Sequence, residues 1–101
     1  MEKVRIGIIG VGQIGKNHLK TYAALPEVEL VAAADIDEQE LTWVAEQFSI
    51  PNTYTDFRQL LARDDLAAVD VCLHNNLHAP VSIAVMQSGK HRVFIKAVVA
   101  G

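Results

Sequence analysis

Three regularly spaced glycines, Gly10, Gly12 and Gly15, directly follow an apolar run near the start of the chain and fit the pattern G-x-G-x-x-G. The first glycine lets the chain turn sharply out of a strand. The second lets the backbone approach a pyrophosphate because it has no Cβ, and the third lets a helix pack closely on the sheet. A helix that begins here presents free N–H groups and a partial positive charge to phosphates. The pattern therefore predicts a dinucleotide site, although the glycines alone are a weak signal.

A carboxylate, Asp35, closes the next apolar run, 20 residues after Gly15. At that place it can accept hydrogen bonds from the adenosine ribose hydroxyls of a dinucleotide, and it repels a 2′-phosphate. The stretch DIDEQE, which begins at Asp35, contains no Lys or Arg. The sequence thus predicts binding of NAD rather than NADP. The alternative is a sheet of the same kind that binds no nucleotide.

The elements that position these residues alternate between strand-like and helix-like patterns. Apolar runs predict buried strands, and amphipathic stretches with capping residues, such as Asp37 and Asp56, predict helices. We expect strands at 4–9, 28–34, 53–55, 67–73 and 92–95, the last of which could continue through Val99, and helices at 13–25, 38–48, 57–63 and 79–88. This order predicts an α/β fold with a doubly wound parallel sheet of Rossmann type. We expect the sheet to be truncated after its fifth main strand.

The composition narrows the class of protein further. The 101 residues suit one domain, 1–101, and the net charge of -3 without a Lys/Arg cluster argues against nucleic acid as a partner. Cys72 is the single cysteine, which excludes an internal disulfide and Cys-pair metal sites, and we predict no metal site. No apolar run is long enough to span a membrane and no signal peptide is evident, so we expect a cytoplasmic protein.

Four stretches carry a family resemblance: IGIIGVGQIGKNH, LVAAADID, YTDFRQLL and VDVCLHNNLHAPVSIAVMQSGKHRVFIK. In this order they resemble the N-terminal half of the Gfo/Idh/MocA oxidoreductases, the relatives of glucose-fructose oxidoreductase and inositol dehydrogenase. The resemblance implies a Rossmann domain for NAD or NADP and hydride transfer between the nicotinamide and a sugar, polyol or related carbonyl compound. It also implies a C-terminal substrate domain that is absent from this chain. We therefore expect the chain alone to be inactive.

The resemblance implies site residues position by position. The phosphate loop corresponds to Gly10, Gly12, Gln13, Ile14 and Gly15, the ribose acid to Asp35, and the adenine side to Ile36. The loop after the fourth main strand would add the cofactor contacts Leu73, His74, Asn75 and His78. Lys96 matches a lysine that lies near the nicotinamide ribose and the substrate, so it is the candidate catalytic residue and a further cofactor contact.

Two stretches depart from the family pattern. Leu73-His74-Asn75 stands where Thr-Pro-Asn is common, and Ile95-Lys96-Ala97 where Glu-Lys-Pro is common. These departures favour an alternative function, a non-catalytic nucleotide-sensing or assembly module of the same fold. Lys96 could then be an edge-strand lysine that discourages strand pairing.

Several other residues are interpreted structurally. We expect His18 to pack beneath the glycine loop rather than to act at the cofactor, and Cys72 to be a small buried hydrophobe. Trp43 is expected in core or domain-contact packing. An unpaired edge strand from Arg92 onwards and an uncovered apolar face predict self-association into a homo-oligomer.

Overall fold

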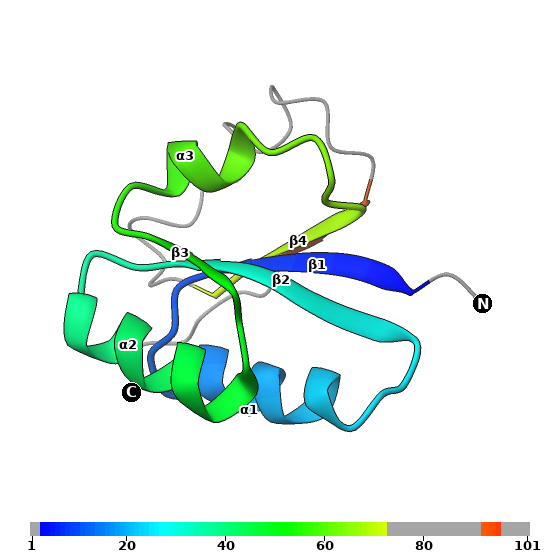
Figure 1. The fold of residues 1–101 in the computed structure, drawn as a ribbon, viewed down its shortest axis with the longest axis horizontal. Helices are drawn as coiled ribbons and strands as arrows, with labels where there is room; N and C mark the ends of the chain where they lie inside the picture. The colour runs from blue at the N-terminus through cyan, green and yellow to red at the C-terminus, as the bar shows by residue number, and fades with distance from the viewer. Residues whose placement is uncertain (1–2, 73–91, 96–101) are drawn as a thin grey trace.

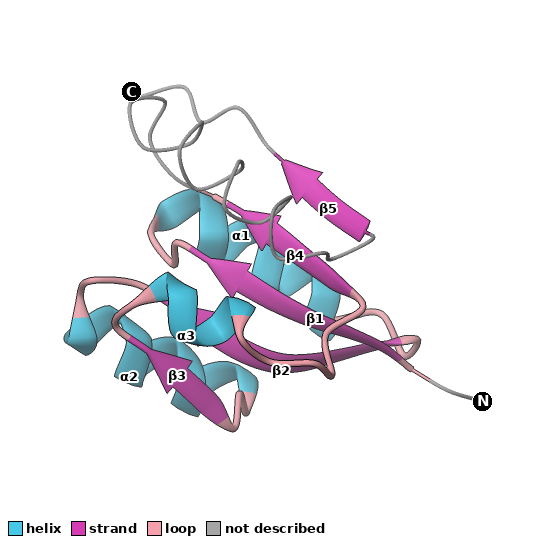
Figure 2. Cartoon of the chain, turned by 90° about the horizontal axis from the view of Figure 1, so that it is seen from above, coloured by secondary structure: helices cyan, strands magenta, loops and turns pink. Residues whose placement is uncertain are grey.

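Five parallel strands form one sheet in the computed structural model, which describes residues 3–72 and 92–95. The strands are β1 (Val4–Ile9), β2 (Val28–Ala34), β3 (Asn52–Tyr54), β4 (Ala68–Val71) and β5 (Arg92–Ile95). Figure 2 shows them side by side in the order β3-β2-β1-β4-β5. Parallel neighbours need crossover connections, and the helices between β1, β2, β3 and β4 provide them. The predicted doubly wound parallel sheet is confirmed.

Helices cover both faces of this sheet (Figure 1). The helices α1 (Gln13–Ala23) and α2 (Glu38–Phe48) lie on one face, and α3 (Phe57–Leu61) lies on the other. As predicted, Asp37 caps α2 by accepting hydrogen bonds from the backbone N–H groups of Gln39 and Glu40, and Asp56 caps α3 through that of Arg58. None of the helices in the described ranges is long and apolar enough to cross a membrane.

The core is divided between the two faces because successive strand residues point to opposite sides. Towards α1 and α2 lies a cluster of buried side chains: Ile8, Val11, Leu19, Ala33, Leu41, Val44, Ile50 and Cys72. Towards α3 lies a second cluster: Ile9, Val31, Ala32, Ala34, Leu60, Leu61, Leu66, Val69 and Val71. A sheet that is buried on both faces accounts for a chain whose residues are 50% hydrophobic.

The element bounds differ from the sequence prediction only at some ends. β1, β2 and α2 have the predicted bounds, whereas α3 and β4 are shorter than predicted and β3 lies one residue earlier. α1 ends at Ala23 because the next two N–H groups, of Ala24 and Leu25, donate to the carbonyl groups of Thr21 and Tyr22 in a tighter turn. The predicted helix at 79–88 and the continuation of β5 through Val99 lie outside the described residues.

Candidate functional site

The carboxyl ends of the central strands meet at one edge of the sheet. Ile9 of β1 is level with Ala34 of β2 and with Val71 of β4. The next residues hold this edge together: the N–H of Gly10 donates to the Ala34 carbonyl over 2.8 Å, and the N–H of Cys72 donates to the Ile9 carbonyl over 2.8 Å. Ligands of open α/β sheets bind at this edge.

The glycines at this edge have different roles. Gly10 has φ 94°, a left-handed conformation that side chains rarely tolerate. A Cβ on Gly15 would lie 2.1 Å from the Gly10 carbonyl oxygen, so the third glycine allows α1 to approach the loop itself. A Cβ on Gly12 would meet nothing within 4 Å in the described part of the chain. No described atom therefore occupies the space where the sequence predicts that the backbone approaches a pyrophosphate.

The first turn of α1 differs from those of α2 and α3. Its N-cap residue is Gly12, which has no side chain, and no described side chain accepts a hydrogen bond from the free N–H groups of this turn. The N–H of Lys16 makes the first hydrogen bond of the helix, to the Gly12 carbonyl over 2.9 Å. The N–H groups before Lys16 have no intrahelical acceptor, and they carry the positive end of the helix dipole. An anionic diphosphate is a suitable acceptor for them.

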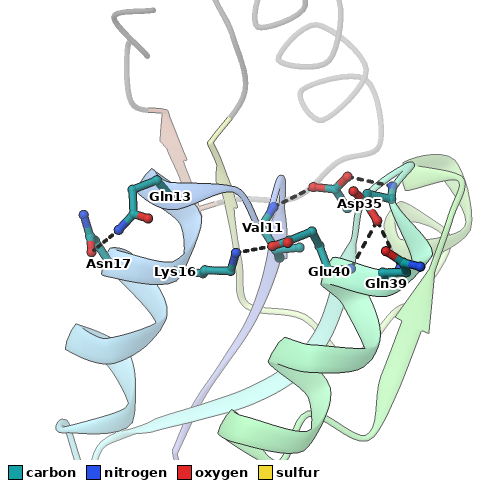
Figure 3. Close-up of polar contacts among 8 residues, drawn as sticks. Val11, Gln13, Lys16, Asn17, Asp35, Gln39 and Glu40 are labelled. Atoms are coloured by element: carbon teal, nitrogen blue, oxygen red, sulfur yellow. Dashed lines mark hydrogen bonds and ion pairs between the residues drawn. The ribbon is translucent and has the colours of Figure 1, made fainter. Parts of the chain in front are cut away.

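Asp35 lies directly beside the glycine loop, as Figure 3 shows. Its Oδ2 accepts a hydrogen bond from the backbone N–H of Val11 over 2.8 Å, and its Oδ1 accepts one from that of Asp37 over 2.9 Å. Two backbone donors thus fix the carboxylate at the end of β2. Each oxygen keeps a further lone pair that can accept from a hydroxyl group. The neighbouring Ile36 is 89% exposed, so its apolar side chain is free to contact a ligand.

An ion pair joins the two helices that flank this edge. Lys16 of α1 pairs with Glu40 of α2 (Figure 3). The Nζ of Lys16 also lies 5.3 Å from the centroid of the Trp43 ring. Trp43 is 44% exposed and packs edge-to-face on Phe48. The tryptophan is therefore on the surface of α2 rather than in the core, and its expected packing against another domain stays a prediction. Lys16 does not carry an uncompensated positive charge.

A polar cluster lies between α1 and β4, on the face of the sheet that α1 and α2 cover. His18 Nδ1 is 2.7 Å from Asp70 Oδ2, and the hydroxyl of Tyr22 donates to that oxygen over 2.6 Å. Cys72 Sγ is 3.1 Å from His18 Nδ1 and 3.3 Å from Asp70 Oδ1. Burial raises the pKa of Tyr22 well above its ordinary value, and the hydrogen bond to the Asp70 carboxylate raises this pKa further. His18 thus contacts the sheet beneath the loop, as expected, but its polar partners were not predicted.

The pattern that could have revealed this cluster is in the sequence. His18 and Tyr22 are four residues apart on one helix face, and Asp70 and Cys72 are two apart on one strand face. A carboxylate in an otherwise apolar strand needs donors, and Asp70 is only 1% exposed.

The predicted cofactor residues divide into two groups. The structure brings seven of them to the edge formed by the ends of β1 and β2: Gly10, Gly12, Gln13, Ile14, Gly15, Asp35 and Ile36. Gln13 donates through its Nε2 to Asn17 Oδ1 over 3.4 Å, and the side chain of Ile14 packs against the core beneath α1 and α2. The other five lie outside the described residues: Leu73, His74, Asn75, His78 and Lys96.

Known proteins are similar to this chain in sequence. A glycosyl hydrolase family 109 protein from Shewanella pealeana is 40% identical over 100 residues, which is 90% of this chain and 22% of that protein. A 4-carboxy-2-hydroxymuconate-6-semialdehyde dehydrogenase from Sphingobium is 34% identical over 88 residues, 87% of this chain and 28% of that protein. The chain thus spans about a quarter of the length of these relatives.

A solved structure shows the same fold. Scyllo-inositol dehydrogenase from Lactobacillus casei, with bound NAD(H) and scyllo-inositol, superposes with a TM-score of 0.83 at 27% identity, over 91% of this chain and 27% of that one. The model of the oxidoreductase family with an NAD-binding Rossmann fold, GFO_IDH_MocA, matches residues 4–96. The chain therefore belongs to the Gfo/Idh/MocA oxidoreductase family and carries its NAD-binding Rossmann fold.

Proposed function

We propose that this chain is the cofactor-binding domain of an NAD-dependent oxidoreductase that transfers hydride between the nicotinamide and a sugar, polyol or related carbonyl compound. The observation that carries the proposal is the hydrogen bond from the Val11 N–H to the Asp35 carboxylate. In this proposal Asp35 is the ribose acceptor. It lies beside the start of α1, which no described side chain caps, and beside Gly12, whose Cβ position has no described atom within 4 Å. The family, and the inositol dehydrogenase that binds NAD(H), support the same function.

Each part of the site has a role in this proposal. The first N–H groups of α1 bind the pyrophosphate above Gly12, Asp35 binds the adenosine ribose, and the exposed Ile36 contacts the adenine. The bound nicotinamide supplies or accepts the hydride. By family resemblance, the nicotinamide half is bound by Leu73, His74, Asn75, His78 and Lys96, with Lys96 also placed at the substrate as the catalytic residue.

NAD rather than NADP is the proposed cofactor. A 2′-phosphate on the ribose would face the Asp35 carboxylate, and the two negative charges would repel each other. No Lys or Arg occurs from Asp35 to Glu40, and the Lys16 cation pairs with Glu40. The charges next to Asp35 thus favour free ribose hydroxyls.

Substrate turnover requires more than the cofactor. Hydride transfer needs the substrate held against the nicotinamide, and the relatives are about four times as long as this chain. We propose that a substrate domain like that of the family completes the site in a cytoplasmic homo-oligomer. The chain alone then binds the dinucleotide without oxidising a polyol.

Two measurements test this function. NAD should raise the melting temperature of the chain, and NADP should raise it less, because only a ligand that binds the folded state stabilises it. Equal melting temperatures with and without NAD would contradict the cofactor assignment. In a protein that joins this domain to a substrate domain, NADH should accumulate when polyols such as scyllo-inositol are added.

A second candidate function is hydrolysis of a glycoside on the same cofactor domain. The 40% identity to a glycosyl hydrolase family 109 protein favours it. Release of nitrophenol from nitrophenyl glycosides without accumulation of NADH would indicate the hydrolase, and NADH formation from a polyol would indicate the dehydrogenase. A nucleotide-sensing module would bind NAD and show neither activity.

A further inference from the structure

We propose that His18, Asp70 and Cys72 form a zinc site that joins α1 to β4. Its three side chains are not among those assigned to the proposed NAD site, although the backbone N–H of Cys72 helps to hold the edge of the sheet where that site lies. The sequence predicted no metal site, because the chain has no pair of cysteines. The fold creates the site by bringing together residues that are 52 and 54 positions apart.

The geometry of the three side chains is close to that of a zinc centre. One ligand atom from each residue lies within 4.8 Å of the other two. His18 Nδ1 is 2.7 Å from Asp70 Oδ2 and 3.1 Å from Cys72 Sγ, and this sulfur is 3.3 Å from the other carboxylate oxygen, Asp70 Oδ1. A tetrahedral Zn²⁺ with bonds of about 2.0 Å to nitrogen and oxygen and about 2.3 Å to sulfur needs ligand atoms roughly 3.3–3.6 Å apart. To reach these separations, His18 Nδ1 and Asp70 Oδ2 must move apart by about 0.6 Å, and His18 Nδ1 and Cys72 Sγ by about 0.4 Å.

The charges of the cluster also suit a divalent cation. A Cys72 thiolate and an Asp70 carboxylate together carry two negative charges, and a neutral His18 adds none. Zn²⁺ makes the set neutral, which matters because Asp70 is 1% exposed and Cys72 is 6% exposed. On binding, the S–H bond of Cys72 breaks, its proton leaves to solvent and a zinc–sulfur bond forms.

The surroundings provide support and access. Tyr22, one turn after His18, donates its hydroxyl hydrogen to Asp70 Oδ2 over 2.6 Å, so it orients the carboxylate from outside the ligand set. Asp70 lies in β4, where it is level with Ile8 of β1 and Phe94 of β5, so its backbone is held on both sides. The side chain of His18 is 21% exposed, which gives an ion and a fourth ligand, such as water, a path to the site.

The alternative is a metal-free network in which Tyr22, His18 and Cys72 donate hydrogen bonds to Asp70. The full chain, stripped of metal with a chelator and titrated with Co²⁺, separates the two. Because Cys72 is the single cysteine, a sulfur-to-cobalt charge-transfer band can come from this site alone, even if other histidines bind cobalt. We expect this band, with the visible spectrum of a tetrahedral ion, at one Co²⁺ per chain, and we expect Zn²⁺ to remove it.

Variants test the roles assigned to Cys72 and Tyr22. Cys72→Ala should abolish the band, and Tyr22→Phe should keep it while lowering the affinity about 10- to 100-fold, as for other residues that orient a ligand. Zn²⁺ should also raise the melting temperature of the unmodified chain but not that of Cys72→Ala. The zinc site is wrong if the folded, unmodified chain shows no charge-transfer band at saturating Co²⁺. It is equally wrong if Zn²⁺ stabilises Cys72→Ala as much as the unmodified chain.

Discussion

A Cβ on Gly15 would lie 2.1 Å from the carbonyl oxygen of Gly10, so the first turn of α1 is in backbone contact with the loop that precedes it. A Cβ on Gly12, between them, would meet none of the described atoms within 4 Å. Two glycines of one motif therefore have different jobs. Gly15 is needed for the fold, whereas in the proposed site Gly12 lets the backbone approach the ligand.

This difference predicts that an alanine substitution affects stability at Gly15 and NAD binding at Gly12. Gly15→Ala should lower the free energy of unfolding by on the order of 3 kcal/mol, because the clash is with backbone that cannot move aside. Gly12→Ala should change it by less than about 1 kcal/mol and should weaken NAD binding. Urea denaturation measures the first effect and calorimetry the second. Equal loss of stability in both variants would contradict the division of roles.

The charge of Asp35 should decide between the two cofactors. Asp35→Asn keeps an oxygen for the Val11 N–H but removes the charge, so NAD should bind about tenfold more weakly. Discrimination against NADP should also decrease. The matched control is Asp37→Asn, which neutralises the neighbouring carboxylate at the cap of α2. If Asp37→Asn changes the ratio of NAD to NADP affinity as much as Asp35→Asn does, the assignment of Asp35 is wrong.

The strands and the glycine loop could be predicted because their signals are local. Apolar runs specify β1 and β2, and the glycine spacing with Asp35 indicates the edge of the sheet at which we propose the cofactor binds. The cluster around Asp70 could not be placed in the same way, because the partners of Asp70 come from a helix about 50 positions earlier. The pairing of β1 with β4 brings Asp70 next to α1, the helix that follows β1.

The ends of elements were less predictable than their existence. α1 was expected to continue to Leu25, but a tighter turn at Ala24 ends it first. The sharp turn at Gly10 was anticipated correctly. The role of Gly15 was anticipated only in part, because its close neighbour is the Gly10 carbonyl of the loop as well as the sheet beneath.

The cap of α2 should contribute measurably to stability. Asp37 accepts hydrogen bonds from the N–H groups of Gln39 and Glu40, so Asp37→Ala should lower the free energy of unfolding by about 1 kcal/mol. Asp37→Asn should recover most of that loss, because asparagine caps about as well. Urea denaturation of both variants measures the effect. An Asn variant as unstable as the Ala variant would assign the effect to charge rather than to capping.

Tyr22 should stay protonated in the folded chain above pH 10. Its folded pKa is raised above the value of about 10 for an unfolded chain, so its contribution to stability is complete below pH 10. That contribution should decrease as the pH rises from 10 towards the folded pKa. In Tyr54→Phe, Tyr22 is the single tyrosine, and ultraviolet absorbance then reports its phenolate alone. Ionisation near pH 10 in a chain still folded by circular dichroism would contradict the burial of this hydroxyl group.

Calorimetric titration of the chain with NAD and NADP, side by side, tests the central claim most directly. Backbone N–H groups at the start of α1 and the carboxylate of Asp35 should bind one NAD per chain, with NADP at least about tenfold weaker because of its 2′-phosphate. Absence of NAD binding by the folded chain, or tighter binding of NADP than of NAD, would contradict the proposed site.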